Sequence, residues 1–442
     1  MKWISLGDWN KYYFLILLLF TVDILDDYIC GEDYNSNFNM TKLFPTEIQT
    51  NLYKHSTVHQ IFKYIGVLFI SIFLFKYERK TTKKESNNNN LIKNDNNLVT
   101  IYKSTSKIEL IHTDEESNLN VYVSPLSVIF IISIWVVNRY LTEIYLRSGF
   151  KDLNFWIFEI ALISYFHSKL FNLKIYNHQK CAIAFNLIIC SLFKLCSFFI
   201  SFKSDEDRSI YSNNYYYIPI GIIFYLITIT LRAYSITKIK WLIDLKYISA
   251  IKVLIISGLI GIIIFSIIIT LETFIKCPDI KVTPFLCDIS YYDENKNTTS
   301  LYIDNIYVYF KILKGDIIKT ENMTKEIIIE IVVIFFGIIF YFLYLYFYVL
   351  IIKNLSPIHC IFTNTIYYII SPLLFLLNNK ITTGYYFQGK EELTLYKFYK
   401  FILDFSSDFF SFFGFLIYLE IIELNFCKLN INLRNRIIQR GR

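Results

Sequence analysis

Long apolar blocks alternate with shorter polar segments along most of the chain. Each block is about as long as a helix needs to cross a hydrocarbon core of roughly 30 Å at a rise of about 1.5 Å per residue. The pattern predicts an all-α membrane protein, a single polytopic domain of about ten transmembrane helices. We expect these helices at residues 12–26, 61–76, 123–146, 154–171, 181–202, 216–235, 250–272, 327–352, 359–377 and 400–423.

The first apolar block has two interpretations, a cleaved signal peptide or a permanent helix. No small-residue cleavage site follows it, and the acidic residues Asp23, Asp26 and Asp27 follow instead. A signal peptide ends in small residues at its cleavage site. We therefore predict an uncleaved first helix.

Basic residues accumulate in every second loop, which sets the predicted orientation. Lys and Arg gather in the loops 77–122, 172–180 and 236–249 and in the tail 424–442. If ten helices alternate, these segments share one face, and the positive-inside rule makes that face cytosolic. We expect both termini in the cytosol. The loop 77–122 contains SNNNNLIKNDNN, a polar run without hydrophobic periodicity, and is predicted to be partly disordered.

Glycosylation sequons support the same orientation. Asn-x-Ser/Thr sequences occur at Asn39, Asn297 and Asn322, and all three fall in loops predicted to be non-cytosolic. We therefore expect residence in the endoplasmic reticulum, the Golgi or the plasma membrane.

The predicted lumenal loop 273–326 also holds two nearby cysteines, Cys277 and Cys287. A disulfide between them suits an oxidising compartment, and two free thiols are the alternative.

Composition and motifs narrow the function classes. Of the residues, 54% are hydrophobic and 18% are charged, whereas soluble domains have about 25% charged residues. The net charge of +7 comes from loop residues, so we expect the lipid bilayer and no nucleic acid as partner. The sequence has no GxSxG, HExxH, Walker A or GxGxxG motif and no metal-spaced Cys/His set. We predict no catalytic residues, no metal and no cofactor, and His55 and His59 as loop residues.

Charged residues inside the predicted helices are the candidate functional groups. A charge at the bilayer centre costs about 2.5–3.5 kcal/mol, so such residues point to function. Arg139, Glu159 and Lys194 are predicted in one layer near the non-cytosolic side, with Glu159 pairing with Lys194 or Arg139. Snorkelling of the basic side chains to the interface is the alternative.

Other polar residues extend this set. Asn138 lies beside Arg139 in the sequence, and Asp23, Asp404 and Asp408 either enter the same layer or face water. Arg232 is predicted near the cytosolic end of its helix, as an interfacial anchor or a gate residue.

Several segments carry a resemblance to known proteins. The segment EIALISYFHSKLFNLKIYNHQKCAIAFNLI (159–188) is similar to the fourth helix, basic loop and fifth helix of the drug/metabolite transporter superfamily, especially its nucleotide-sugar and triose-phosphate transporter branches. Further segments resemble a group of multi-pass proteins of lower eukaryotes: KIKWLIDLKYISAIKVLIISGLIGII (238–263), NLSPIH (354–359) and GFLIYLEIIELNFCKLN (414–430).

The transporter resemblance implies a fold and a mechanism. It implies two inverted five-helix repeats, here residues 12–202 and 216–423, with the substrate near the midplane between them. A small anionic metabolite, such as a nucleotide sugar or an organic phosphate, would then move by alternating access. Substrate contacts would come from Arg139, Lys194, Arg232 and Asn138, while Glu159 would hold a cation in place or carry a proton.

Two other functions stay open at this point. A lumen-facing glycosyltransferase using a lipid-linked sugar would place catalytic acids just after the first helix, where Asp23, Asp26 and Asp27 stand. A non-catalytic scaffold or receptor would bind its partners through the loop 77–122 and the lumenal loops. Association into a homo-oligomer is compatible with all three functions.

Overall fold

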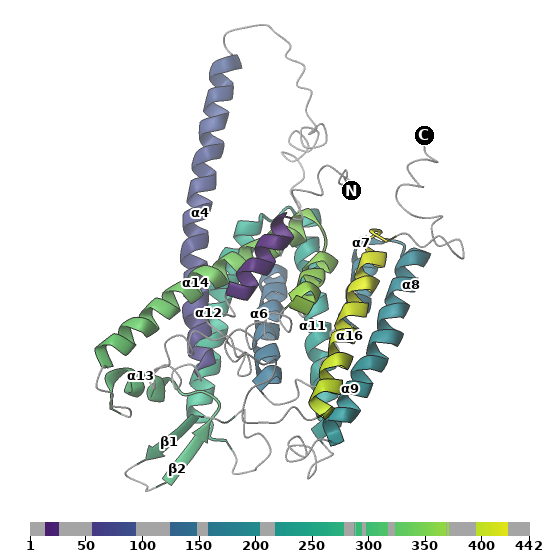
Figure 1. The fold of residues 1–442 in the computed structure, drawn as a ribbon. Helices are drawn as coiled ribbons and strands as arrows, with labels where there is room; N and C mark the ends of the chain where they lie inside the picture. Colours follow the sequence, from purple (N-terminus) through teal and green to yellow (C-terminus); the bar gives the residue numbers. More distant parts are fainter. Residues whose placement is uncertain are drawn as a thin grey trace.

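The computed structural model describes residues 14–25, 55–93, 124–147, 158–203, 217–277, 287, 289–293, 298–316, 323–367, 369–370 and 395–422. These residues form a bundle of long helices with a small sheet at one end (Figure 1). The helices are residues 14–25, α4 (Ser56–Lys93), α6 (Pro125–Arg147), α7 (Phe158–Phe171), α8 (Asn177–Phe185), α9 (Ser191–Lys203), α11 (Tyr217–Lys246), α12 (Ala250–Phe274), α13 (Ile306–Lys314), α14 (Met323–Asn354), residues 357–367 and α16 (Leu395–Tyr418). The π-helical segment η2 (Asn186–Cys190) joins α8 to α9.

Every predicted apolar block overlaps a helix in the described part of the chain. Within that part, seven helices are long and apolar enough to cross a membrane. They cover Ser56–Tyr77, Pro125–Tyr145, Asn177–Ser197, Pro219–Lys246, Ala250–Phe274, Ile327–Asn354 and Tyr399–Tyr418, and Phe14–Leu25 is a shorter apolar helix. The chain is therefore a multi-pass helical membrane protein. Ten crossings and cytosolic termini stay predictions.

Two helices continue beyond their predicted ends. α4 continues to Lys93 and projects beyond the other helices (Figure 1), so the loop predicted to start at residue 77 is helical as far as that point. Extending an existing helix needs no new nucleus, and Lys, Arg and Glu favour the helical state. Polarity alone therefore did not distinguish a polar helix from a disordered loop. Residues 94–122 lie outside the described residues.

α11 likewise continues past the predicted end at residue 235 to Lys246. This places Arg232 near the middle of the helix, whereas the sequence predicted it near the cytosolic end.

The predicted lumenal loop 273–326 contains an antiparallel hairpin, so the fold is not purely α-helical. β1 (Ile289–Asp293) pairs with β2 (Thr298–Tyr302), with Ile289 opposite Tyr302. Tyr, Thr and Ile in these strands favour extended structure. The hairpin and α13 lie at the end of the bundle opposite to the projecting part of α4 (Figure 1).

One large hydrophobic core joins α4, α6, α7, α11, α12, α14 and α16. α4 and α12 approach closely, since a Cβ added at Gly258 would lie 2.9 Å from the Leu68 Cα atom. Small residues allow helix backbones to approach in this way in membranes.

Candidate functional site

Arg232 of α11 and Glu159 of α7 form an ion pair in the helical bundle. The Arg232 Nε atom lies 3.1 Å from Glu159 Oε1. The Glu159 side chain is 1% exposed and that of Arg232 is 24% exposed. A charge so deeply buried is retained only with a partner of opposite charge, because each ion loses its hydration. The pair is therefore a polar centre within the helical bundle.

Further polar residues gather around this pair from other helices. The α14 residue Tyr344 lies within electrostatic reach of Asp23, Arg139 and Arg232, and the next turn of α14 places Tyr348 within reach of Arg232 and Glu159. Charged residues of four different helices, namely Asp23, Arg139, Glu159 and Arg232, therefore lie around Tyr344 and Tyr348.

Arg139 also contacts the next tyrosine toward the start of α14. Its guanidinium lies 5.8 Å from the ring centre of Tyr341, and the Lys63 ammonium lies 5.3 Å from the same ring. Such cation–π contacts are stronger where water is excluded. The neighbouring side chain of Asn138 is 4% exposed, and its Oδ1 makes no hydrogen bond with the described residues.

Lys194 lies in a second ionic group between α9 and α16. Its Nζ atom lies 3.0 Å from Asp404 Oδ1 and 3.5 Å from Asp408 Oδ1. Both acids were predicted either to enter the buried layer or to face water, and the structure places them on Lys194. The predicted partners of Glu159, Lys194 or Arg139, are wrong: Glu159 pairs with Arg232. The reason is that spacing along the chain gives the depth of a residue but not the neighbour its helix faces.

Hydrogen bonds between η2 and α16 extend this polar group. Ser411 Oγ donates to Asn186 Oδ1 at 2.7 Å, and Ser407 Oγ donates to the Cys190 carbonyl at 3.0 Å. A Cβ added at Gly414 would overlap the Asn186 side-chain amide. π-Helical turns of this kind are frequent at functional sites.

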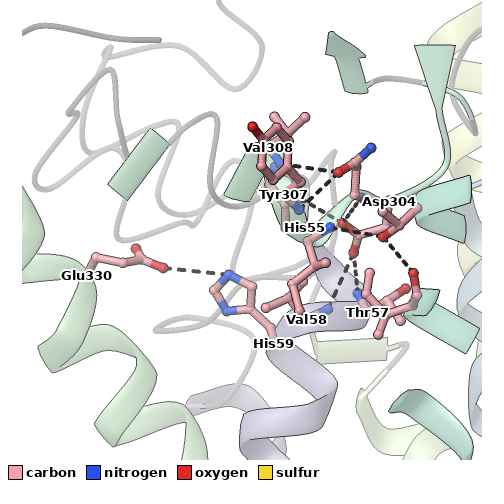
Figure 2. Close-up of polar contacts among 12 residues, drawn as sticks. His55, Thr57, Val58, His59, Asp304, Tyr307, Val308 and Glu330 are labelled. Atoms are coloured by element: carbon pink, nitrogen blue, oxygen red, sulfur yellow. Dashed lines mark hydrogen bonds and ion pairs between the residues drawn. The ribbon is translucent and has the colours of Figure 1, made fainter. Parts of the chain in front are cut away.

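A third polar cluster lies at the hairpin end of the bundle and was missed by the sequence analysis (Figure 2). His55 Nδ1 lies 2.6 Å from Asp304 Oδ1, and the two side chains are 1% and 0% exposed. Asp304 Oδ2 also accepts the backbone N–H groups of Thr57 at 2.9 Å and Val58 at 3.4 Å. Asp304 therefore satisfies the open N–H groups in the first turn of α4, in the manner of a helix cap supplied from a distant segment.

The same cluster includes His59 and a tyrosine of α13. His59 Nε2 lies 3.6 Å from Glu330 Oε1 (Figure 2), and the Tyr309 ring meets the rings of His55 and His59 edge-on at 5.4 and 5.9 Å. Burial, followed by the charges of Glu330 and Asp304, raises the pKa of the Tyr309 phenol. The prediction that both histidines lie in a loop is wrong for His59, which is in α4, while His55 directly precedes that helix. The spacing of four residues between His55 and His59 places two side chains on one helix face, and this was the signal in the sequence that could have indicated the cluster.

Beside this cluster, Tyr140 Oη donates to Glu272 Oε1 at 2.6 Å, which links α6 to the end of α12. Within the described residues, no group of three or more His, Cys, Asp or Glu side chains is arranged to hold a metal ion.

At each end of the bundle, contacts join segments that the predicted orientation places on the same side of the membrane. His55 meets Asp304 at the hairpin end. At the other end, Lys240 Nζ donates to the Lys353 carbonyl at 2.8 Å, and His178 Nε2 lies 3.0 Å from Glu420 Oε1. The predicted pairing of Cys277 and Cys287 is present as a disulfide. The sequons Asn39, Asn297 and Asn322, like Asp26 and Asp27, lie outside the described residues.

The fold and these buried ionic groups define the class: a multi-pass helical membrane protein with charged pairs between its helices. No protein-family profile matches the chain, and no curated protein is similar to it.

Proposed function

We propose that this protein is a proton-coupled transporter of a small organic anion, such as a nucleotide sugar or an organic phosphate. The observation that carries the proposal is the buried pair of Arg232 and Glu159. A guanidinium binds phosphate and carboxylate groups in a two-pronged geometry, so it is a suitable anion ligand within a bundle. Its present partner, Glu159, must release it before an anion can bind.

Protonation of Glu159 provides that release. When the carboxylate accepts a proton, its negative charge is lost and the Arg232 guanidinium becomes available to the incoming anion. When the proton leaves on the other side of the membrane, the carboxylate recovers Arg232 and displaces the anion. One proton then accompanies each anion. In this scheme Arg139 adds positive charge to the same region, and Lys194, held between Asp404 and Asp408, keeps α9 on α16.

Helix packing supports the two-repeat architecture that alternating access requires. Counting the predicted spans from the N-terminus, the pseudo-two-fold axis of such an architecture would relate each span to the one five positions later. The second span (α4) packs on the seventh (α12), and the fifth (α8, η2, α9) packs on the tenth (α16). α6, the third span, packs on α12, the seventh, and α4, the second span, packs on α14, the eighth. An operation that exchanges the third span with the eighth and the second with the seventh would convert one of these two contacts into the other.

The test is uptake into proteoliposomes with a panel of nucleotide sugars and organic phosphates under an imposed pH gradient. We expect uptake of at least one anion, stimulated by a proton gradient in the direction of transport. Arg232→Gln should abolish it. Glu159→Gln should retain exchange of anion for anion but lose the stimulation. Lys252→Gln, which removes an exposed lysine at the start of α12, is the matched control and should behave as wild type. If folded protein moves no anion of the panel, the proposal fails and a scaffold or receptor role is favoured.

The glycosyltransferase alternative gains no specific support from the described residues. Asp23 lies within the helix of residues 14–25 and in reach of Tyr344 rather than in a loop.

A further inference from the structure

The hairpin end of the bundle carries a small structural unit that we call the cap: β1, β2 and α13. We propose that the cap is a gate and that Asp304 is the latch that holds it shut on α4. The inference concerns access of water and solutes to the bundle from the hairpin end. It does not depend on anion transport, because it concerns only whether the cap opens.

The hydrogen bonds of the latch are concentrated in one side chain. Asp304 lies between β2 and α13, and its carboxylate contacts His55 and the backbone N–H groups of Thr57 and Val58 (Figure 2). Its Oδ1 also accepts the N–H of Asn305 at 2.6 Å, which fixes the turn into α13. Asn305 in turn is the N-terminal capping residue of helix α13, because its Oδ1 accepts hydrogen bonds from the backbone N–H groups of Tyr307 and Val308. The cap and the start of α4 are therefore joined through residues 249 positions apart in the sequence.

The remaining attachment of the cap divides into two parts. On the α12 side the cap is tied to the chain: the Cys277–Cys287 disulfide, the backbone bond from Cys277 N–H to the Leu301 carbonyl, and the Ile306 N–H bond to Thr273 Oγ1. On the α4 side it rests on Asp304 and on the Tyr309 ring, which meets the rings of His55 and His59. A small apolar cluster that includes Val58, Ile269 and Val308 joins the cap to both α4 and α12. The cap is thus hinged at α12 and latched at α4.

Buried polar atoms lie where the cap meets the helices. The Tyr309 hydroxyl of the cap and Glu330 Oε1 of α14 are buried, and neither makes a hydrogen bond with the described residues, although Glu330 Oε1 lies 3.6 Å from His59 Nε2. Their side chains are 1% and 2% exposed. Buried polar atoms are nearly always hydrogen-bonded, so exceptions call for an explanation. A cap that opens gives one, because the open state exposes these atoms to water.

The experiment measures access directly, in the full-length protein in proteoliposomes and without any transported solute. A reporter cysteine is placed under the cap by Ile269→Cys, where the native side chain is 3% exposed. The rate at which this cysteine reacts with a membrane-impermeant maleimide is measured after subtracting the labelling of the protein without the added cysteine. Reductant is left out so that the disulfide persists. A second reporter, Phe265→Cys, lies one turn deeper in α12 at a fully buried position of the main core.

Adding Asp304→Ala should accelerate labelling at position 269 by about tenfold or more, the factor that corresponds to losing about 1.4 kcal/mol of cap closure. Labelling at position 265 should stay unchanged. Asp316→Ala, which removes an exposed acid beyond the other end of α13, is the control and should have no effect. His55→Gln keeps the Asp304 bonds to the α4 backbone and should therefore accelerate labelling at position 269 to a smaller extent. It replaces Asp304→Ala in the experiment if that variant does not fold.

Two results overturn the proposal. Unchanged labelling at position 269 in both Asp304→Ala and His55→Gln shows that Asp304 is not a latch. Equal acceleration at positions 265 and 269 shows that Asp304 supports the whole bundle rather than the cap. Failure of anion uptake leaves this measurement unaffected, so the transport proposal and the gate proposal are tested independently.

Discussion

Arg232 and Glu159 face each other from α11 and α7, with 3.1 Å between Nε and Oε1, and Glu159 is almost fully buried. Removing one partner leaves the other charge unpaired inside the protein, which costs about 3–5 kcal/mol for a buried pair. Removing both costs less, because no lone charge remains.

We therefore expect Arg232→Gln to lower the free energy of unfolding in detergent by about 3–5 kcal/mol. The double variant Arg232→Gln/Glu159→Gln should be more stable than Arg232→Gln alone. A double-mutant cycle measured by denaturant titration gives the coupling energy. Additive losses would show that the two groups do not interact in the protein.

The second prediction concerns Lys194, whose ammonium separates the carboxylates of Asp404 and Asp408. Lys194→Met should lower the unfolding midpoint, because two acids then face each other. The loss should fall between the about 1 kcal/mol of an exposed pair and the about 3–5 kcal/mol of a buried one. Adding Asp404→Asn and Asp408→Asn should restore part of it. Lys252→Met, at an exposed position, is the control, and an equal loss there would contradict the ion-pair explanation.

The third prediction tests the close approach of α4 and α12. An added Cβ at Gly258 would meet the Leu68 backbone, which cannot move aside as a flexible side chain can. Gly258→Ala should therefore destabilise the protein by about 1–3 kcal/mol through overpacking. Leu259→Ala, at a neighbouring residue with 48% exposure, should have a smaller effect. Thermal unfolding in detergent checks both, and a Gly258→Ala variant as stable as wild type would place α4 farther from α12.

The fourth prediction concerns the disulfide between Cys277 and Cys287, which closes a short loop in front of the hairpin. A loop of this length contributes about 2–3 kcal/mol by restricting the unfolded chain. Cys277→Ser/Cys287→Ser should loosen the cap and accelerate labelling of Ile269→Cys, while labelling of Phe265→Cys stays unchanged. Cys196→Ser, an exposed free cysteine in α9, is the matched control. No change at position 269 would show that the disulfide does not hold the cap.

The fifth prediction tests the orientation of the chain. If the cap faces the lumen, Asn297 and Asn322 are open to glycosylation, and glycosidase treatment should increase electrophoretic mobility. Asn297→Gln and Asn322→Gln should each remove one step of the shift, and Asn39→Gln a third. The comparison variant is Asn354→Gln, whose sequence Asn-Leu-Ser-Pro falls on the predicted cytosolic side and should leave the mobility unchanged. A shift that depends on Asn354 would reverse the orientation.

Local patterns carried much of the architecture. The helix positions follow from apolar blocks matched to the thickness of a bilayer, and the disulfide from two cysteines close together in one polar loop. Both are short-range properties, because helix formation and loop closure over ten residues involve only neighbouring parts of the chain. The ends of α4 and α11 were predicted less well: α4 continues through a polar sequence, whereas the added turns of α11 are buried in the core, so packing rather than local polarity decided where that helix ends.

The sequence by itself determined where the apolar helices lie and that charges lie among them. Only the tertiary structure decided that Glu159 meets Arg232, that Lys194 meets two acids of α16, and that Asp304 meets His55. The physical reason is that an ion pair depends on the order and rotation of helices around one another. Those are fixed by packing over the whole bundle, and no spacing along a single helix encodes them.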